Sequence, residues 1–519
     1  MMSTEQKPGC SVTLNAPVDP GEQLTLLQVH PRDNVLVALQ PLAAGSALAE
    51  PFAHISAKQA IPAGHKVALT AIAKGESVIK YGFAIGAATS DIAVGEHIHS
   101  HNLATLLSGQ VDYRYNGCQA PKLSFPAGVA TEFMGYRRAN GKVGTRNELW
   151  IINTVGCVNR AAMRVAEQAR KLYGDQIDGI HAFTHPFGCS QLGDDLANTR
   201  TLLAGLIQHP NAGGVLVMGL GCENNQLSKL LAASPGVDQS RIRSFNAQQV
   251  EDEIEQGLQA VAELVAQMRD DKRTACPVSD LVVGMKCGGS DGLSGLTANP
   301  LVGRIADLVA AGNGKVVLTE TPEMFGAEQV FMARAANEQV FGDIVTLVND
   351  FKQYFIDNKQ PVYENPSPGN KDGGLTTLEE KSLGAIQKGG SAIVRQVIRY
   401  GEMASHSGLT LLEGPGNDAV SSTALTAAGA TLLLFTTGRG TPLGFPAPTV
   451  KISSNSALAG RKPQWIDYDA GGLLKKGQDA TEFSQQFFSY LLDVASGKTT
   501  RNEQTDNREI AIWKNGVTL

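Results

Sequence analysis

The chain has 519 residues, which is enough for two to four domains. Only 18% of the residues are charged and the net charge is −6, which argues against a disordered chain and against nucleic-acid or membrane-surface partners. No apolar run approaches the roughly 18 residues that a membrane span needs. The start has no signal-peptide pattern and the seven cysteines are thinly spread, so we expect a cytoplasmic protein without a disulfide scaffold.

The first predicted unit is a small all-β domain over residues 24–105. Glycines separate short Val/Ile/Ala runs at about the spacing of a compact β fold. The motif GEHIHSHN places three histidines at alternate positions, and alternate side chains of a strand share one face. A divalent metal site is therefore predicted, and an exposed strand edge with harmless histidines is the alternative. The candidate metal ligands are His30, His65, His97 and His99.

Residues 106–130 have weak periodicity with glycines and prolines, which predicts a linker. The basic turn YRRANGKVGTRNEL follows it. Arginine binds carboxylates through two parallel hydrogen bonds, so Arg146 and the neighbouring Asn147 are candidates for substrate binding. A solvated basic turn explains the segment equally well.

From residue 131 onward, strand-like runs alternate with helix-like segments, a rhythm typical of mostly parallel sheets. A break near residues 272–280 divides this part into a central domain, 131–272, and a C-terminal domain, 273–519. The predicted fold class is thus α/β, with the small all-β domain followed by two α/β domains. The expected strands are 149–156, 179–185, 213–221, 281–286, 315–320, 409–414 and 431–438, with helices over 160–174 and 249–271.

Four cysteines follow predicted strands at a regular spacing. Cys157, Cys189 and Cys222 are 32 and 33 residues apart, about one βαβ unit, and Cys287 follows after 65. The spacing predicts equivalent places at the carboxyl ends of parallel strands, where open α/β sheets bind ligands. An iron or iron–sulfur centre on these four thiolates is one interpretation. Packing of small residues in tight turns is the other.

Glycine-rich loops with several polar residues lie at the same predicted edge, over 185–195, 219–226 and 286–300. They suit a hydroxylated, anionic small molecule, although ordinary helix capping needs some of the same residues. Three residues at strand ends are candidate catalytic groups. His185 is one, because an unperturbed histidine has a pKa near 6.5 that suits a base, while Glu320 would need burial to raise its pKa. Asp291 is the third, in the last of these loops.

The remaining candidates for substrate binding are Asn299 in the loop 286–300, Lys371 and Arg439. Lys371 and Arg439 each lie in a long polar Gly/Pro loop, over 364–382 and 436–455. Such loops beside apolar strands form a fair pocket wall, and plain surface loops are the alternative.

These motifs together resemble the altronate/galactarate dehydratase family. The resemblance spans essentially the whole chain, from HPRDNVLVAL to REIAIWKNGVTL. GEHIHSHN and GCSQLGDD are similar to the altronate branch of the family, and the N-terminal unit resembles its SAF domain. The motifs that carry it are IPAGHKVAL, GEHIHSHN, YRRANGKVGTRNELWI, TVGCVN, FGCSQLGDD, GLGCENNQ, CGGSDGLSGLTANP, TETPEMFGAEQ, ENPSPGNKDGGLTTLEEKSLG and FTTGRGTP.

The resemblance implies dehydration of D-altronate to 2-dehydro-3-deoxy-D-gluconate in hexuronate (galacturonate) catabolism, with Fe(II) and possibly Mn(II) as the cofactor. It implies a small-molecule sugar acid as the partner, and we expect a homo-oligomer, a dimer. One alternative is a related sugar-acid dehydratase, such as galactarate dehydratase, with a cysteine-bound iron–sulfur centre. The other is a sugar-acid binding protein without catalysis.

Overall fold

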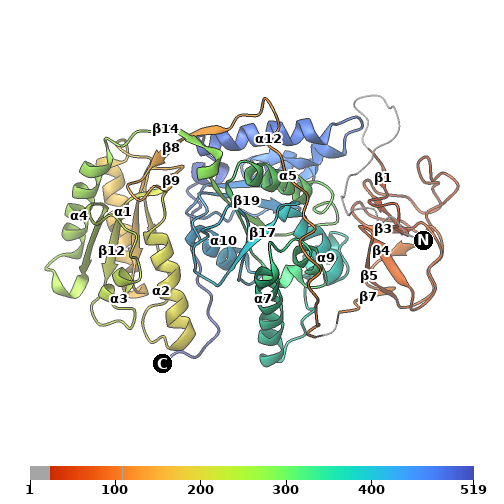
Figure 1. Ribbon diagram of the computed structural model, residues 1–519, viewed down its shortest axis with the longest axis horizontal. Coiled ribbons are helices and arrows are strands. Elements are labelled where there is room, and N and C mark those ends of the chain that lie inside the picture. The colour runs from red at the N-terminus through yellow and green to blue at the C-terminus, as the bar shows by residue number, and fades with distance from the viewer. Residues whose placement is uncertain (1–23, 108) are drawn as a thin grey trace.

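The computed structural model describes residues 24–107 and 109–519, which form three units in a row (Figure 1). The N-terminal β unit lies at one end of the molecule and the first α/β domain at the other. The C-terminal α/β domain lies between them, so the order in space differs from the order along the chain. The predicted fold class is confirmed by this arrangement.

Seven short strands build the N-terminal β unit. They form a four-stranded sheet in the order β1-β2-β3-β6 and a three-stranded sheet in the order β4-β5-β7, and all pairings are antiparallel. Glycines with positive φ, such as Gly95 at 79°, allow the tight turns between them. The strands are β1 (Leu26–Leu27), β2 (Val35–Ala38), β3 (Lys66–Ala68), β4 (Ser77–Lys80), β5 (Phe83–Ala88), β6 (His97–Ile98) and β7 (Leu103–Ala104).

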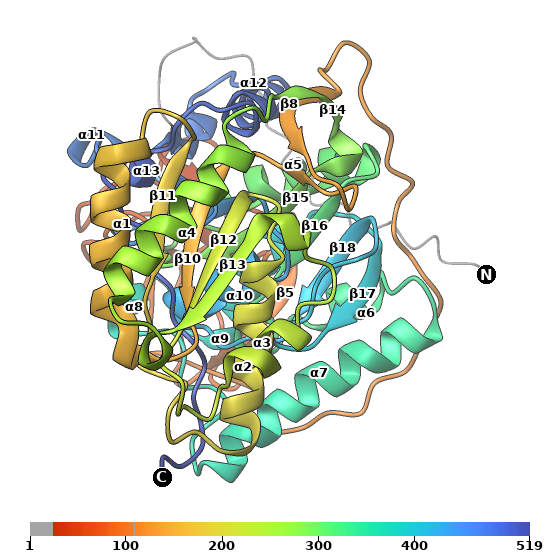
Figure 2. The ribbon, with the colours of Figure 1, turned by 90° about the vertical axis from the view of Figure 1, so that its left-hand side faces the viewer.

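The first α/β domain has a four-stranded parallel sheet in the order β11-β10-β12-β13 (Figure 2). Helices α1 and α4 cover its outer face, while α2 packs between the sheet and the C-terminal domain. Helix α4 begins where the Asp252 carboxylate accepts from two backbone N–H groups. The elements are β10 (Glu148–Asn153), α1 (Asn159–Tyr173), β11 (Gly179–Phe183), α2 (Gly193–Ile207), β12 (Ala212–Gly219), α3 (Leu227–Ala232), β13 (Ile242–Asn246) and α4 (Glu253–Met268).

The C-terminal domain has a seven-stranded parallel sheet in the order β17-β18-β16-β15-β19-β20-β21. Its central strands are buried apolar runs, as expected of parallel strands covered on both faces. The strands are β15 (Val282–Cys287), β16 (Lys315–Leu318), β17 (Val394–Ile398), β18 (Gly408–Leu412), β19 (Leu432–Thr437), β20 (Thr449–Ser453) and β21 (Tyr468–Asp469). The helices are α5 (Ala298–Ala311), α6 (Gln329–Met332), α7 (Glu338–Asp357), α8 (Pro368–Asp372), α9 (Leu378–Ala385), α10 (Asp418–Ala427), α11 (Ser456–Arg461), α12 (Ala480–Ala495) and α13 (Arg501–Gln504).

The segment 106–130 runs over the C-terminal domain without helix or strand in its described residues (Figure 1). It is held along its length: the Gln119 N–H donates to the Ala333 carbonyl at 2.8 Å, and the Phe125 ring packs on Phe488. It leads into a small antiparallel sheet in the order β14-β8-β9. These strands are β8 (Glu132–Arg137), β9 (Val143–Gly144) and β14 (Thr274–Pro277).

All seven strands expected in the α/β part are present, within a few residues of their predicted bounds. Four further strands of the two parallel sheets, β13, β17, β20 and β21, were missed, as were β8, β9 and β14 of the small antiparallel sheet. The predicted polar loop 436–455 contains β20, and the predicted loop 364–382 contains α8 and the start of α9, so both loop predictions were wrong in part. No helix within residues 24–107 and 109–519 combines the length and apolar character that a membrane crossing requires.

Candidate active site

Three of the four candidate metal ligands lie together on the β unit. The ring centroids of His65, His97 and His99 are 5.0 to 5.6 Å apart, and His65 Nδ1 lies 3.0 Å from His97 Nε2. His30 lies elsewhere, with its Nδ1 accepting from the Arg32 N–H at 3.1 Å. Among the described residues, no ring contact or hydrogen bond joins His30 to the other three.

Two of the three rings are placed as neighbouring ligands of a divalent ion, but one nitrogen from each of His65, His97 and His99 does not bring all three within 4.8 Å of one another. Burial lowers the pKa of each ring, and for His97 the neighbouring histidines add to this effect and bring the pKa to about 4. The rings are therefore neutral near pH 7, which is the state that binds metal. The 3.0 Å between the nitrogens of His65 and His97 matches two adjacent ligands with metal–nitrogen bonds of roughly 2.1 Å.

The C-terminal domain orients two of these rings. His99 Nε2 lies 2.9 Å from the Lys371 carbonyl oxygen, and His65 Nε2 lies 3.3 Å from that of Asp372. A metal-binding histidine commonly donates its second ring N–H to a carbonyl in this way, which fixes the tautomer. The histidine face thus meets helix α8 of the other domain.

A buried ion-pair triad joins the same two domains. Lys66 and Lys80 of the β unit each lie 2.8 Å from the Glu380 carboxylate of α9, and all three side chains are fully buried. Burial alone would raise the pKa of Glu380, but the two ammonium groups hold it well below its usual range. One positive charge remains in excess next to the histidines, which favours an anionic ligand there.

Asp291 lies at this junction, in the loop after β15. Its carboxylate accepts hydrogen bonds from Ser294, Ser454, Asn455 and the Leu293 N–H, at 2.8 to 3.2 Å. The next residue, Gly292, packs so closely on the β unit that an added Cβ would lie 2.0 Å from the Gly64 carbonyl oxygen. This contact brings Asp291 close to the histidine face, since Gly64 directly precedes His65.

Two cations border the same junction. Lys371 supplies the carbonyl that faces His99, and Arg439 follows Gly438, whose added Cβ would lie 2.3 Å from the Asp291 carboxyl carbon. In the described residues, no hydrogen-bond or ion-pair partner is found for either cationic group, so both remain available to a ligand. We call this set the interdomain site; its residues are His65, His97, His99, Asp291, Lys371 and Arg439.

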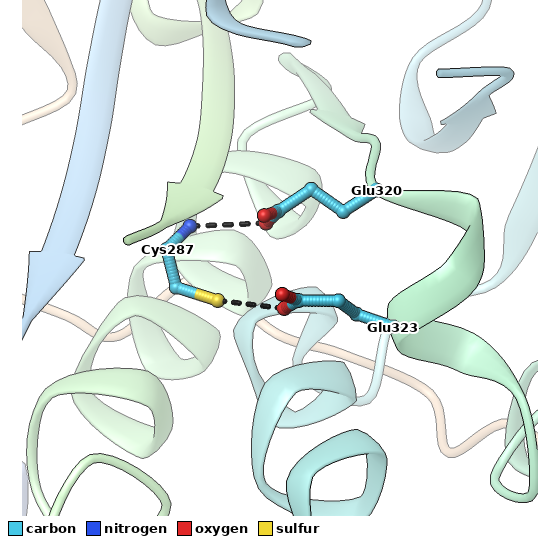
Figure 3. A group of neighbouring side chains, drawn as sticks. All are labelled: Cys287, Glu320 and Glu323. Atoms are coloured by element: carbon cyan, nitrogen blue, oxygen red, sulfur yellow. Dashed lines mark hydrogen bonds between the residues drawn. The ribbon is translucent and has the colours of Figure 1, made fainter. Parts of the chain in front are cut away.

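A second cluster lies at the ends of β15 and β16 (Figure 3). The Cys287 N–H donates to Glu320 and its thiol to Glu323, both at 3.0 Å, and Lys388 Nζ lies 2.7 Å from the sulfur. Lys286 pairs with Glu320, and Lys381 pairs with Glu323 at 2.8 Å. We call this the strand-end network; its residues are Lys286, Cys287, Glu320, Glu323, Lys381 and Lys388.

The strand-end network contains the one group of three possible metal ligands within 4.8 Å found in the described residues: Cys287, Glu320 and Glu323. Three ammonium groups occupy its carboxylates, and burial raises the pKa of the Cys287 thiol far above its usual value. A neutral thiol among lysines is a poor environment for a dication, so the group is better described as an ion-pair network.

The strand-end network supports the interdomain site. Lys381 Nζ donates to the Asn370 side chain at 3.2 Å, and the Asn370 amide donates to the Ser290 carbonyl at 2.8 Å. Asn370 precedes Lys371, and Ser290 precedes Asp291. The network therefore fixes the two segments that carry these candidate residues, which is a positioning role.

Comparison with known proteins decides the family. Three family models match in succession: "Altronate/galactarate dehydratase SAF domain" over 24–106, "D-galactarate dehydratase/Altronate hydrolase, second domain" over 135–269 and "D-galactarate/Altronate dehydratase, C-terminal" over 278–518. An altronate dehydratase of Escherichia coli (strain K12) is 51% identical over 95% of this chain and 99% of its own length. The chain belongs to the altronate/galactarate dehydratase family.

Similarity within the family is uneven. An altronate dehydratase of Bacillus subtilis (strain 168) is 49% identical, over 95% of this chain and all of its own length. A galactarate dehydratase (L-threo-forming) of Escherichia coli is 33% identical, over 91% of this chain and 93% of its own. The resemblance predicted from the motifs is confirmed, and so is the SAF nature of the β unit.

Arg146 was predicted to bind substrate and His185 to act as a base, but the polar atoms of both side chains bond within the protein. All five N–H groups of Arg146 have partners, namely Glu503 and the carbonyls of Thr145, Val494 and Lys498, so none is left for a substrate carboxylate. His185 is buried, and both ring nitrogens bond to backbone, at Asn153 and Phe187. The geometry gives both residues a structural role.

Three other predicted residues are also held inside the protein. Asn147 bonds to Arg138 and Met268, and Asn299 bonds to Thr436 and Gly384. The Glu320 carboxylate accepts from Lys286, Lys388 and the Cys287 N–H inside the strand-end network. Of the three catalytic candidates, Asp291 alone lies at the interdomain site.

The cysteines do not occupy four equivalent places. Cys157, Cys189 and Cys222 follow β10, β11 and β12 of one sheet and are exposed. Cys287 is the last residue of β15 in the other sheet and is buried in the strand-end network. The regular spacing suggested one series because each sheet repeats a similar βαβ length, although the fourth cysteine belongs to another domain.

Most of the lysines and glutamates that support the interdomain site were not predicted from the sequence, namely Lys66, Lys80, Lys286, Glu323, Glu380, Lys381 and Lys388. One signal was available: a lysine within a buried apolar run, as Lys66 in IPAGHKVAL and Lys286 in LVVGMK, requires a buried acidic partner. The partner of Lys66, Glu380, lies 314 residues away, so the pairing itself could not be read from the sequence.

Proposed function

We propose that this protein removes water from D-altronate to give 2-dehydro-3-deoxy-D-gluconate in hexuronate catabolism. The observation that carries this proposal is the gap in identity: 51% and 49% to two altronate dehydratases, against 33% to a galactarate dehydratase. The expected dimer and the cytoplasmic location are part of the same proposal. The unpaired cysteines of the described chain fit a reducing compartment.

The interdomain site is where we place the substrate. Lys371 and Arg439 supply cations for the sugar-acid carboxylate, and the excess charge of the Lys66–Lys80–Glu380 triad adds to the attraction. His65, His97 and His99 are the proposed ligands of Fe(II) or Mn(II), which when bound would act as a Lewis acid on the substrate oxygens.

Dehydration requires a base for the C2 proton, next to the carboxylate, and assistance to the C3 hydroxyl as it leaves. We assign the proton transfer to Asp291, because it is the catalytic candidate at the interdomain site and lies beside Gly438 and Gly373, in the loops that carry Arg439 and Lys371. Its hydrogen bonds from Ser294, Ser454 and Asn455 hold the carboxylate in one orientation.

An assay with two substrates tests the proposed function. Protein purified without oxygen and loaded with Fe(II) or Mn(II) is given D-altronate or galactarate, and formation of the 2-keto acid is followed. We expect turnover of altronate, with a kcat/KM at least about tenfold above that for galactarate. Turnover of galactarate alone would contradict the assignment, and binding without turnover would favour a sugar-acid binding protein.

Solvent-deuterium exchange at C2 of altronate tests the base. Asp291→Asn is expected to bind substrate but to exchange the C2 proton at least about 100-fold more slowly, a typical loss for a general base. The matched variant is His185→Asn, which alters the other candidate base, a buried histidine of the first α/β domain. Normal exchange in Asp291→Asn would remove Asp291 from this role.

A further inference from the structure

The first α/β domain carries three thiols that the interdomain site does not use. Cys157, Cys189 and Cys222 follow the adjacent strands β10, β11 and β12 at the carboxyl edge of the four-stranded sheet (Figure 2). All three are exposed and unpaired. Free cysteine is usually among the most buried residues, so three exposed thiols at one sheet edge need an explanation.

Hydrogen bonds tie the three cysteine loops to one another. The Gly156 N–H donates to the Phe187 carbonyl at 2.9 Å, which joins the loops of Cys157 and Cys189. The Asn225 N–H donates to the Gly188 carbonyl at 3.0 Å, which joins those of Cys189 and Cys222. The Asn225 side chain donates to the Thr154 carbonyl at 3.1 Å and closes the triangle. The three cysteines are thus held in a fixed relation.

The backbone next to Cys189 is held in an unfavourable conformation. Ser190 has φ of 56°, in the left-handed region that residues with a Cβ rarely adopt. Gly188 has φ of 102°, and an added Cβ there would lie 2.1 Å from the Thr154 carbonyl oxygen. Strain of this kind persists where the surrounding structure holds a ligand-binding segment in place.

The three sulfur atoms do not form a compact single-ion site. In the described part of the chain, these cysteines do not belong to a group whose ligand atoms all lie within 4.8 Å of one another. A single zinc or iron ion draws its thiolates close together, whereas each thiolate of an iron–sulfur cluster binds a different iron atom. The amide of Gln248 also donates to Cys222 Sγ at 3.5 Å, and hydrogen bonds to sulfur tune such clusters.

From this geometry we propose that Cys157, Cys189 and Cys222 bind a four-iron, four-sulfide cluster. Cys287 is not a ligand, because it is buried in the other domain between Lys388 and Glu323. Three thiolates leave one iron atom without a cysteine, so that iron is open to water or to an oxygen of a hydroxy acid. This site is separate from the histidine face, and the inference does not depend on the identity of the substrate.

Iron and acid-labile sulfide analysis tests the proposal. The full chain is reconstituted without oxygen with Fe(II) and sulfide, desalted and analysed with no substrate present. We expect about four sulfides per chain, together with an electron paramagnetic resonance signal after reduction by dithionite. Ferricyanide added to a separate, unreduced sample should remove one electron and release about one Fe(II) per cluster, leaving a three-iron cluster with its own signal, since one iron lacks a cysteine.

Single variants identify the ligands. Cys157→Ser, Cys189→Ser and Cys222→Ser should each lose most of the sulfide, whereas Cys118→Ser, an exposed cysteine of the segment 106–130, should keep it. His99→Ala should also keep it, which separates this site from the histidine face. Absence of sulfide in the reconstituted wild type, binding of zinc without sulfide, or full sulfide in all three variants would each overturn the proposal. Thermal unfolding of each variant verifies that the domain is folded.

Discussion

The carboxyl edges of the two parallel sheets differ in their exposure to solvent. At the carboxyl edge of the first α/β domain, three cysteines are exposed to solvent. At the same edge of the C-terminal domain, Cys287 and its charged neighbours are buried beneath α9 and the following turn that carries Lys388. A strand end therefore presents reactive groups in both sheets, but the segments that cover it decide whether those groups meet solvent or one another.

The largest effect is expected from a change in α9, one of the segments that cover the strand ends of the C-terminal domain. Glu380→Ala leaves Lys66 and Lys80 buried without their carboxylate, and an uncompensated buried charge costs about 3–5 kcal/mol. We expect the midpoint of the first unfolding transition to move to a lower urea concentration, and activity to be lost. Glu263→Ala is the control, because its pair with Arg243 is exposed and contributes at most about 1 kcal/mol. Equal shifts in the two variants would contradict the importance of the triad.

The alkylation rates of the cysteines measure the difference in exposure between the two sheet edges. In metal-free protein, Cys157, Cys189 and Cys222 should react quickly with iodoacetamide, as mapped peptide by peptide. Cys287 should react at least about 100-fold more slowly, because it is reached only by local opening and burial keeps its thiol protonated. Fast labelling of Cys287 in the folded protein would show that the cover opens readily.

The histidine face can be compared with a histidine outside it. His99→Ala should weaken Mn(II) binding at least about tenfold, because it removes a ring oriented by the Lys371 carbonyl. His30→Ala should leave the affinity unchanged, since its ring contacts its own turn. Titration of Mn(II) by electron paramagnetic resonance measures both. The reverse ranking would restore His30 as a ligand and remove His99.

The two predicted substrate arginines offer a matched pair. Arg439→Lys should raise KM for altronate by roughly tenfold with little change in stability, because lysine cannot make the paired hydrogen bonds to a carboxylate. Arg146→Lys should do the opposite: it loses buried bonds to Glu503 and three carbonyls and lowers stability. Steady-state kinetics and urea unfolding distinguish the two. A raised KM in Arg146→Lys without loss of stability would support the original clamp.

The smallest effect expected is on pH dependence. The pKa of His97 is lowered to about 4 in the folded protein, below the usual 6.5. The unfolded chain therefore takes up the proton first, so this stability is present above pH 6.5 and is lost as the pH falls toward 4. Between pH 7 and 5, in EDTA, the melting temperature of the wild type should fall more than that of His97→Gln. Parallel curves would show that the ring is not buried as described.

Local sequence patterns predicted much of the fold. Contacts between residues far apart in the sequence could not be predicted in this way. Buried apolar runs such as LTLL and TLLLFTT predicted their strands well, whereas β20 was missed because Lys451 interrupts it. The alternation in GEHIHSHN correctly placed His97 and His99 near one another. The buried ion pair of Arg146 was not anticipated, because its partner Glu503 lies 357 residues away and no local pattern reveals such a pair.

The path of the segment 106–130 has a consequence for assembly of the interdomain site. It holds the β unit and the C-terminal domain on one chain, so their docking is intramolecular and proceeds at a high effective concentration. A protein cut within this segment would have to form the same contacts between separate molecules. Its activity would then depend on dilution, whereas the intact chain keeps its histidines and Asp291 together at any concentration.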